Sequence, residues 1–546
     1  MGEPKYQLRP YQVDDLAFHI ANPKSLNLSD PGTGKTPTVC VLAYYHWAKH
    51  GRKTLWVMPK SLMEKNKDEI PQFTAFDPED ITILESDFAP LTKNWTGPTF
   101  TRQKRIRSMR IRLATGETTT TYEYDGPGNL VYSAPLKNEQ GPGWWTIGKS
   151  EPSRQLPENP ALCFPLLRPD GKPQYKVFYE DEEAKDLIAA AKDAKVFICT
   201  FSFLRSHWER LLDTIPEIDV LIVDEFHMGY STADSQQTES FFFTVDRCSQ
   251  FCAMTGTLID GRLDSAFPAI HAIEPRYYGS RQGFLDEHAL SYDNFDRVTQ
   301  WHNFDKLKAI LARHSVRHTF EEVYGDEPVH FETKVVQMGP QCREKYDEFH
   351  EQAMLELENM EVLDGTLPGV NLIRAQQIMG HPETMGLAKG EVTGKDKYLA
   401  ALATEGRPML VFAQLQPEQE RCVKVLEEQG LRVGLINANV SAKQRAKIDV
   451  AFRAGELDAI VGSGPTVAVG YNWERADLVV FISIDYKDVN VLQAYRRASR
   501  GSRTTPLRVI FVQYENSVDQ RKYQIVKVKS EMANQVDPTR KILEVA

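Results

Sequence analysis

The sequence predicts an α/β protein with two lobes, each built around a parallel sheet. Short apolar strands alternate with helical stretches over residues 1–85 and 186–275, which together would form the first lobe. The alternation returns over 331–546, which would form the second lobe and a C-terminal tail. Residues 86–185 are rich in Pro, Gly and Thr and predict a β-rich insertion in the first lobe. The aromatic and charged segment 276–330 predicts a short helical connector.

Individual strands follow from short, continuous apolar runs. The first lobe has candidates at 54–58, 196–199 and 220–223. The second lobe has candidates at 335–336, 409–412, 459–461, 478–484 and 509–512. Runs of this kind are typical of strands that are buried on both faces of a parallel sheet.

Composition and charge exclude several classes of protein. A net charge of −10 over 546 residues excludes nucleic-acid binding by bulk attraction, so any such contact must be local. Apolar runs are far shorter than the roughly 20 residues of a membrane-spanning helix, which predicts no membrane partner. The N-terminus lacks a secretory pattern, and the seven scattered cysteines form no disulfide framework. We therefore expect a cytoplasmic protein.

Residues 30–36, with the sequence DPGTGKT, are typical of a phosphate-binding loop. Glycines let backbone N–H groups surround a phosphate, the lysine reaches the β- and γ-phosphates, and the last threonine can bind Mg²⁺. The expected nucleotide-binding residues here are Gly32, Thr33, Gly34, Lys35 and Thr36. Ser29 stands where the strict pattern has glycine, and a glycine turn that caps a helix is the alternative interpretation.

An acidic pair, Asp224 and Glu225, follows the apolar strand 220–223. Ligands of open α/β sheets bind at the carboxyl ends of the strands, where this pair would lie. Asp224 could hold Mg²⁺, and Glu225 could orient and deprotonate an attacking water. Such a pair alone is often a solvated loop, but together with the phosphate loop it predicts ATP hydrolysis.

Five segments, in this order along the chain, resemble motifs of the superfamily 2 helicases. They are 8–12 (LRPYQ), 30–36, 224–227 (DEFH), 254–258 (MTGTL) and 493–501 (QAYRRASRG). Within the superfamily, the chain is most similar to the Swi/Snf-type DNA translocases, on segments 8–12, 59–62 (PKSL) and 463–473 (SGPTVAVGYNW). The resemblance implies two RecA-like lobes with ATP and Mg²⁺ between them. It also suggests a compact member of the bacteriophage type.

The resemblance assigns further roles around the nucleotide. It makes Gln12 the residue that recognises adenine, and it places His227 and Gly470 near the nucleotide. Arg497 and Arg500, on a helix of the second lobe, would act on the transferring phosphoryl group when the lobes close. The alternative is a solvated basic helix end. Arg496 departs from the family pattern, which commonly has glycine or an acidic residue there.

The resemblance also implies contacts to a nucleic-acid backbone. The residues are Lys60, Ser61, Thr200, Phe201, Ser463 and Thr466. The alternative for each is ordinary turn chemistry. Pro465 stands where lysine is usual, so this loop is expected to be stiffer and less basic than in the family.

The insertion carries a basic run over residues 102–112. On a strand, strict alternation would place Arg105 and Arg107 on one face and the other basic residues of the run on the opposite face. Phosphate contact is one interpretation, and a solvated edge strand that resists aggregation is the other.

Together these features predict an ATP-dependent DNA helicase or translocase that acts as a monomer on duplex, forked or branched DNA. Two alternatives stay open. One is an RNA helicase, since the DEFH segment is close to a motif of RNA enzymes. The other is a nucleotide-dependent clamp that binds nucleic acid without productive turnover.

Overall fold

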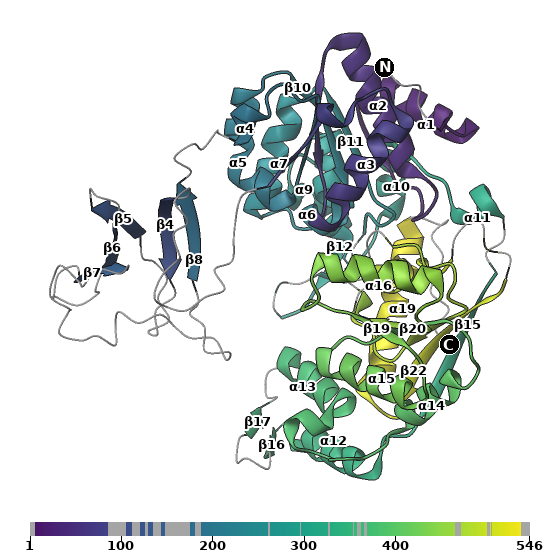
Figure 1. Cartoon of the computed structure of the whole chain (residues 1–546). Coiled ribbons are helices and arrows are strands. Elements are labelled where there is room, and N and C mark those ends of the chain that lie inside the picture. The colour runs from purple at the N-terminus through teal and green to yellow at the C-terminus, as the bar shows by residue number, and fades with distance from the viewer. Residues whose placement is uncertain are drawn as a thin grey trace. The chain divides into compact units, whose positions relative to one another are not determined.

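We describe a computed structural model of the chain. It describes residues 6–85, 105–111, 121–125, 129–134, 143–147, 175–180, 187–259, 262–294, 296, 298–325, 328–352, 354–356, 362–364, 368–464, 471–486, 488–499, 503 and 505–536. The chain divides into two compact units. One unit contains residues 1–83, 195–208 and 217–546, and the other contains 84–194 and 209–216. Figure 1 shows both predicted sheets within the first unit.

The first sheet, in the described residues, has seven strands in the order β14-β1-β11-β10-β2-β9-β3. The strands are β1 (Lys24–Asn27), β2 (Lys53–Val57), β3 (Ile81–Leu84), β9 (Val196–Cys199), β10 (Ile218–Asp224), β11 (Gln250–Met254) and β14 (Ser315–Val316). The pairs from β14 through β9 are parallel. Every residue of β2, β9 and β11 is buried, as expected of strands covered on both faces.

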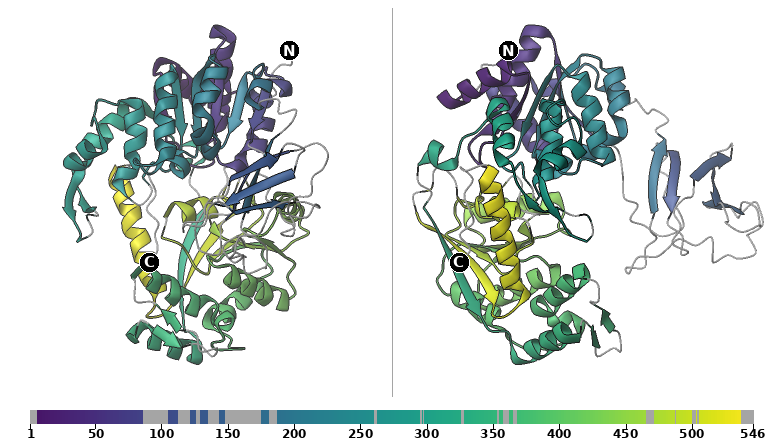
Figure 2. Two further views of the ribbon diagram at one scale, coloured as in Figure 1. Left: turned by 90° about the vertical axis from the view of Figure 1, so that its left-hand side faces the viewer. Right: turned by 180° about the vertical axis from the view of Figure 1, so that it is seen from behind.

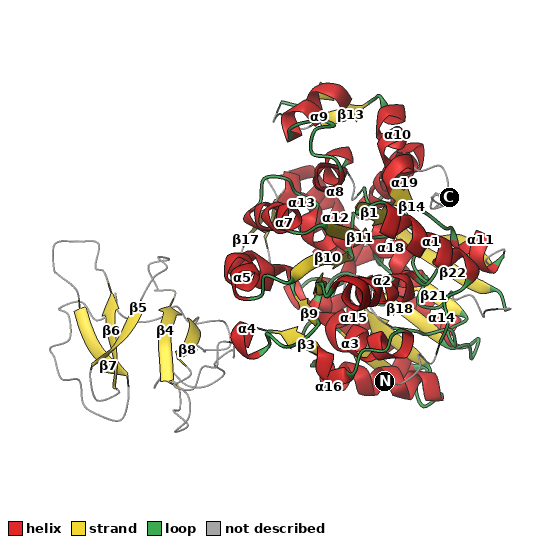
Figure 3. Cartoon of the chain, turned by 90° about the horizontal axis from the view of Figure 1, so that it is seen from above, coloured by secondary structure: helices red, strands yellow, loops and turns green. Residues whose placement is uncertain are grey.

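Helices cover both faces of this sheet, which explains why its strands are apolar throughout (Figure 3). One face is covered by α2 (Lys35–His50) and α3 (Met63–Phe73). The other is covered by α5 (Phe201–Thr214), α7 (Gln236–Arg247) and α8 (Phe267–Ile273). Two further helices of this lobe are α1 (Pro10–Ala21) and the short α6 (Phe226–Tyr230).

The connector is helical only in part. It contains α9 (Arg281–His288), α10 (Phe304–His314) and α11 (Phe320–Tyr324), together with the antiparallel pair β12 (Ala289–Tyr292) and β13 (Val298–Trp301). Its strand β14 pairs with β1 and so extends the first sheet. The sequence did not predict this strand, because Ser315 and Val316 are too few residues to show a period.

The second sheet has six strands among the described residues, in the order β15-β22-β21-β18-β20-β19, all paired in parallel. The strands are β15 (Val329–Val336), β18 (Met409–Phe412), β19 (Val433–Ile436), β20 (Ala459–Gly462), β21 (Leu478–Phe481) and β22 (Leu507–Tyr514). Its helices are α12 (Pro340–Gln352), α13 (Pro368–Gly380), α14 (Gly394–Ala403), α15 (Gln416–Glu428), α16 (Ala442–Ala454), α18 (Asp488–Tyr495) and α19 (Val518–Val536). The long helix α19, yellow in Figure 2, packs against α18 and β22. A short antiparallel pair, β16 (Met354–Glu356) and β17 (Val362–Asp364), completes this part. The predicted fold class, with two parallel-sheet lobes, is confirmed.

The insertion contributes antiparallel strands, in line with its predicted β character. In the described residues, β4 (Arg105–Ile111) pairs with β8 (Tyr175–Glu180), and β6 (Asn129–Ala134) lies between β5 (Thr121–Asp125) and β7 (Gly143–Ile147). The short helix α4 (Leu187–Ala190) follows. The register of β4 shifts between Ile106 and Ser108, so Arg107 lies in a bulge. The strict alternation predicted for the basic run is therefore wrong at Arg107.

Among the described helices, none combines the length and the apolar character that crossing a membrane requires.

Candidate nucleotide and nucleic-acid site

The predicted site residues of the first lobe gather at one edge of its sheet. Because the strands are parallel and adjacent, the segments that follow β1, β11, β10, β2 and β9 all leave the sheet at its carboxyl edge. The phosphate loop follows β1, and the acidic pair follows β10. Lys60 and Ser61 follow β2, and Thr200 follows β9. The nucleotide residues thus occupy one half of the edge, and the nucleic-acid candidates occupy the other half.

The phosphate loop is folded around the ammonium group of Lys35. Its Nζ donates to the backbone oxygens of Ser29 at 2.7 Å and Asp30 at 3.0 Å. Gly32 and Gly34 have φ values of +91° and +87°, a region that favours glycine, which explains why both positions need it. Gly34 precedes the first turn of α2, so the loop leads directly into a helix N-terminus that can bind an anion.

Gln12 supports this loop from the first turn of α1. Its Nε2 donates to the backbone oxygen of Gly34 at 2.8 Å, and its Oε1 accepts from the backbone N–H of Arg9 at 2.8 Å. The hydroxyl of Tyr11 donates to the backbone oxygen of Thr33. The motif predicted to recognise adenine therefore contacts the phosphate loop in this structure.

The acidic pair lies close to Lys35. Burial and the charge of Glu225 raise the pKa of Asp224 well above its usual range, while Asn66 donates to its Oδ2 at 3.4 Å. Burial lowers the pKa of Lys35, although the charges of Glu225 and Asp224 act against it. Glu225 has a φ of +48°, a rare conformation for a residue other than glycine. Such strain at a loop of this kind is typical of a functional position.

Two neighbouring motifs meet at His227. Its Nδ1 lies 2.9 Å from Oγ1 of Thr255 and 3.6 Å from Oε2 of Glu225. Thr255 follows β11, whereas His227 and Glu225 follow β10. The hydrogen bond therefore joins the segments after two adjacent strands. It also places His227 beside the residue predicted to activate water.

The second lobe brings a different arginine to the phosphate loop from those predicted. Nη1 of Arg496 lies 2.9 Å from Oδ2 of Asp30. Arg497 is also buried, and its backbone oxygen accepts from Trp473. Arg500, like Gly470 and Thr466, lies outside the described residues. In the sequence, Arg496 stands out only as a departure from the family pattern, and no local pattern there records its pairing with Asp30.

The nucleic-acid candidates differ in exposure. Lys60 and Ser61 are exposed in a short turn, and Thr200 accepts through Oγ1 from the backbone N–H of Phe203 at 3.1 Å. The ring of Phe201 instead packs on Tyr230 at a centroid distance of 5.3 Å and is buried. The structure therefore does not support a nucleic-acid contact by its side chain, because apolar packing within the lobe holds it. Arg105 and Arg107 lie on β4, for which the structure describes the backbone and not the side chains.

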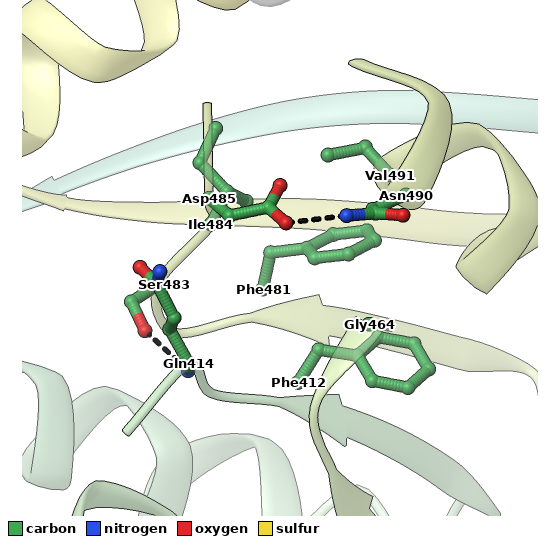
Figure 4. Close-up of a pocket in the computed structure, with 9 residues that line it drawn as sticks. All are labelled: Phe412, Gln414, Gly464, Phe481, Ser483, Ile484, Asp485, Asn490 and Val491. Carbon is green, nitrogen blue, oxygen red and sulfur yellow. Dashed lines mark hydrogen bonds between the residues drawn. The ribbon is translucent and has the colours of Figure 1, made fainter. Parts of the chain in front are cut away.

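The corresponding edge of the second lobe is hollowed at the ends of β18, β20 and β21 (Figure 4). The lining residues are Phe412, Gln414, Gly464, Phe481, Ser483, Ile484, Asp485, Asn490 and Val491. Asn490 donates to Asp485 across this pocket, and the backbone N–H of Gln414 donates to Oγ of Ser483 at 2.8 Å. Ser463, a predicted nucleic-acid contact, adjoins it in sequence.

The residues at the first edge fit a magnesium nucleotide. Lys35 offers a half-buried cation, the helix that it begins offers an N-terminus, and Thr36 and Asp224 offer oxygen ligands. The described residues contain no group of three or more His, Cys, Asp or Glu side chains that could hold a metal alone. Mg²⁺ is usually held by one or two carboxylates together with phosphates and waters.

The fold and these motifs resemble those of a superfamily 2 helicase core. Residues 394–502 match the family model described as Helicase conserved C-terminal domain. The chain is 21% identical over 349 residues to an uncharacterized ATP-dependent helicase of Mycoplasma pneumoniae, covering 62% of this chain and 32% of that protein. It is 24% identical over 309 residues to the zebrafish (Danio rerio) chromodomain-helicase-DNA-binding protein 1-like, covering 53% of this chain and 29% of that protein.

The chain thus spans about a third of the length of the curated relatives it matches. A solved Sulfolobus solfataricus SWI2/SNF2 ATPase core in complex with dsDNA also matches, at 15% identity and a TM-score of 0.36, over 100% of this chain and 99% of that one. The resemblance to Swi/Snf-type superfamily 2 helicases that the motifs predict is confirmed by the family model and the curated relatives. The bacteriophage type stays a prediction.

Proposed function

We propose that the chain is an ATP-dependent DNA translocase or helicase that uses Mg²⁺. The observation that carries the proposal is the meeting, at one sheet edge, of the half-buried Lys35 ammonium, the Asp224–Glu225 pair and an arginine from the second lobe. A clamp that only binds ATP needs no group to activate water. The presence of Glu225 in a strained, partly exposed position therefore favours turnover over the clamp alternative.

The chain's own residues supply distinct functions. ATP, when bound with Mg²⁺, would supply the phosphoryl group whose transfer to water releases free energy. Lys35 would turn from the backbone oxygens of Ser29 and Asp30 to bind phosphate, which is a charge-assisted contact. Asp224 and Thr36 would hold the metal. Glu225 would orient water and accept its proton, and we retain Arg497 and Arg500 as candidates for stabilising charge in the transition state.

DNA as the substrate rests on two lines of support. The name of one relative describes a DNA-binding helicase, and the second half of the sheet edge offers Lys60, Ser61 and Thr200 beside the nucleotide residues. Side chains of this kind usually bind phosphates and position a protein on DNA without specifying sequence. We therefore propose duplex, forked or branched DNA as the substrate, bound mainly through its backbone.

The test is the rate of ATP hydrolysis with double-stranded DNA, single-stranded DNA, forked DNA and RNA as separate stimulants. We expect duplex or forked DNA to stimulate most. Preferential stimulation by RNA would favour the RNA helicase alternative. Tight nucleotide and DNA binding without hydrolysis under any condition would favour the clamp.

A further inference from the structure

Asp30 joins three parts of the chain at the phosphate loop. Its Oδ2 pairs with Nη1 of Arg496 at 2.9 Å and accepts from the backbone N–H of Phe320 at 3.3 Å. Its Oδ1 lies 3.4 Å from Nη2 of Arg317. Arg317 and Phe320 belong to the connector, and Arg496 follows α18 of the second lobe. The carboxylate is thus surrounded by donors from outside its own segment.

This ion pair is buried. The side chains of Arg496 and Asp30 are 4% and 8% exposed, and the guanidinium also lies over the ring of Phe320, 5.6 Å from its centroid. Burial alone would raise the pKa of Asp30, but the charges of Arg496 and Arg317 outweigh it and lower the pKa. Asp30 therefore carries a negative charge at neutral pH that water screens poorly.

That charge stands at the place where a nucleotide would bring more negative charge. The backbone oxygen of Asp30 is one of the two that hold the Lys35 ammonium. The charge of Asp30 is also among those that act on Lys35, and so is the opposite charge of Arg496. An unpaired carboxylate here would repel the phosphates that Lys35 has to bind.

We infer that Arg496 is a positioning residue that neutralises the Asp30 carboxylate, so that the phosphate loop can accept a polyphosphate. The inference rests on one part of the proposed function, namely that the phosphate loop binds a nucleotide. It goes beyond that function because it gives a role to an arginine of the second lobe that is distinct from the transition-state role considered for Arg497 and Arg500.

A consequence is a chain-specific coupling between the lobes and the nucleotide. Arg496 belongs to the second lobe. Moving that lobe away from the loop would therefore leave the negative charge of Asp30 less neutralised and would weaken nucleotide binding. By reciprocity, a bound polyphosphate favours the arrangement in which Arg496 is close. The coupling is electrostatic and requires no contact between Arg496 and the nucleotide.

Equilibrium binding tests the inference without hydrolysis or DNA. AMP, ADP and a non-hydrolysable ATP analogue are titrated calorimetrically into the whole chain and into Arg496→Ala, Asp30→Asn and the double variant. We expect Arg496→Ala to weaken binding of the ATP analogue about tenfold, which is about 1.4 kcal/mol, with smaller losses for ADP and AMP. Adding Asp30→Asn should return the affinity to within about threefold of the unmodified chain.

The matched control is Arg432→Ala. Arg432 pairs with Asp458 at 2.8 Å within the second lobe, and its loss should leave nucleotide affinity unchanged. If Arg496→Ala does not fold, the Asp30→Asn variant alone tests the inference. It should bind the ATP analogue at least as tightly as the unmodified chain. Weaker binding by that variant would overturn the inference.

Three other results would overturn it: unchanged affinity in Arg496→Ala, an equal loss for AMP and the ATP analogue, or a double variant as weak as Arg496→Ala. Each of these leaves the proposed function standing, since the unmodified chain still binds nucleotide. Failure of the unmodified chain to bind the ATP analogue would overturn the proposed function as well.

Discussion

Nδ1 of His227 lies 2.9 Å from Oγ1 of Thr255, and the direction of this hydrogen bond can be assigned. The Thr255 hydroxyl donates its proton to the backbone oxygen of Thr257 at 2.7 Å. Its oxygen can therefore only accept from His227, which places the proton of the neutral ring on Nδ1. Glu225, with Oε2 at 3.6 Å from the same nitrogen, fits this assignment because a carboxylate is attracted to an N–H group.

The first prediction concerns Thr255. Thr255→Val removes the acceptor that fixes the His227 ring beside Glu225, and an unsatisfied buried donor costs about 1–3 kcal/mol. We expect kcat for ATP hydrolysis to fall roughly tenfold or more, since each factor of ten is about 1.36 kcal/mol, with KM nearly unchanged. Thr255→Ser keeps the hydroxyl and serves as the control. Steady-state kinetics would contradict the assignment if the two variants behaved alike.

The second prediction separates nucleotide binding from water activation. Lys35→Ala should weaken ATP binding and abolish turnover, because it removes a charge-assisted phosphate contact. Glu225→Gln should bind ATP nearly as well as the unmodified chain and yet not hydrolyse it. Calorimetric titration and phosphate release measure the two properties independently. Normal hydrolysis by Glu225→Gln would show that the proposed role of this residue is wrong.

The third prediction compares the glycines at the two ends of α2. Gly34 and Gly51 have φ values of +87° and +67°, so alanine at either position costs about 1–2 kcal/mol of stability. A Cβ atom at Gly34 would also lie 2.7 Å from Nε2 of Gln12, whereas nothing lies within 4 Å at Gly51. We expect Gly34→Ala to lose nucleotide binding and Gly51→Ala to retain it.

A combined variant tests the reason for this difference. Gln12→Ala removes the side chain that the new Cβ atom would meet, so it should recover part of the stability lost in Gly34→Ala. Thermal melts of the single and combined variants measure the recovery. No recovery would mean that backbone strain at Gly34 accounts for the whole loss.

The comparison of sequence and structure shows which features local patterns can predict. The phosphate loop was found from its glycine, lysine and threonine pattern, and the acidic pair was found because it follows a continuous apolar strand. The pairing of Arg496 with Asp30 joins residues far apart in the chain, and no local pattern records it. Phe201 shows the reverse case, since its place in a family motif did not reveal that its ring is buried against Tyr230.

The fourth prediction is a pH dependence of stability that arises at His19. This side chain is fully buried in α1, its Nδ1 lies 2.9 Å from Oγ of Ser25, and burial lowers its pKa from 6.5 to about 4. Between these values the unfolded chain binds the proton more readily than the folded chain, so stability falls as the pH falls. At 1.36 kcal/mol per pKa unit the loss amounts to about 3 kcal/mol.

Urea unfolding at pH 7 and pH 4.5 measures this contribution. His19→Gln should lose less stability over the interval than the unmodified chain, whereas substitution of the exposed His50 should leave the loss unchanged. If all three proteins lose the same stability between pH 7 and pH 4.5, groups other than His19 cause the acid sensitivity.

The last prediction concerns the basic run of the insertion, which we propose as a phosphate-contacting surface. Neutralising Arg105, Arg107 and Arg110 on β4 should weaken DNA binding and reduce its dependence on salt. Each lost phosphate contact lowers the slope of log affinity against log salt by about 0.9 on duplex DNA, so three contacts would lower it by about 2.7. Basal ATP hydrolysis should persist, because β4 belongs to a different compact unit from the nucleotide residues.

A matched control uses three exposed arginines of the second lobe, Arg407, Arg432 and Arg453, which precede β18, β19 and β20 at the amino edge of the sheet. Because this edge is opposite the one that carries Ser463, we expect their neutralisation to leave the salt slope unchanged. DNA affinity is titrated at several salt concentrations for the unmodified chain and both triple variants. If the β4 variant keeps the slope of the unmodified chain, the basic run does not contact DNA, and the alternative of an edge strand that resists aggregation is favoured.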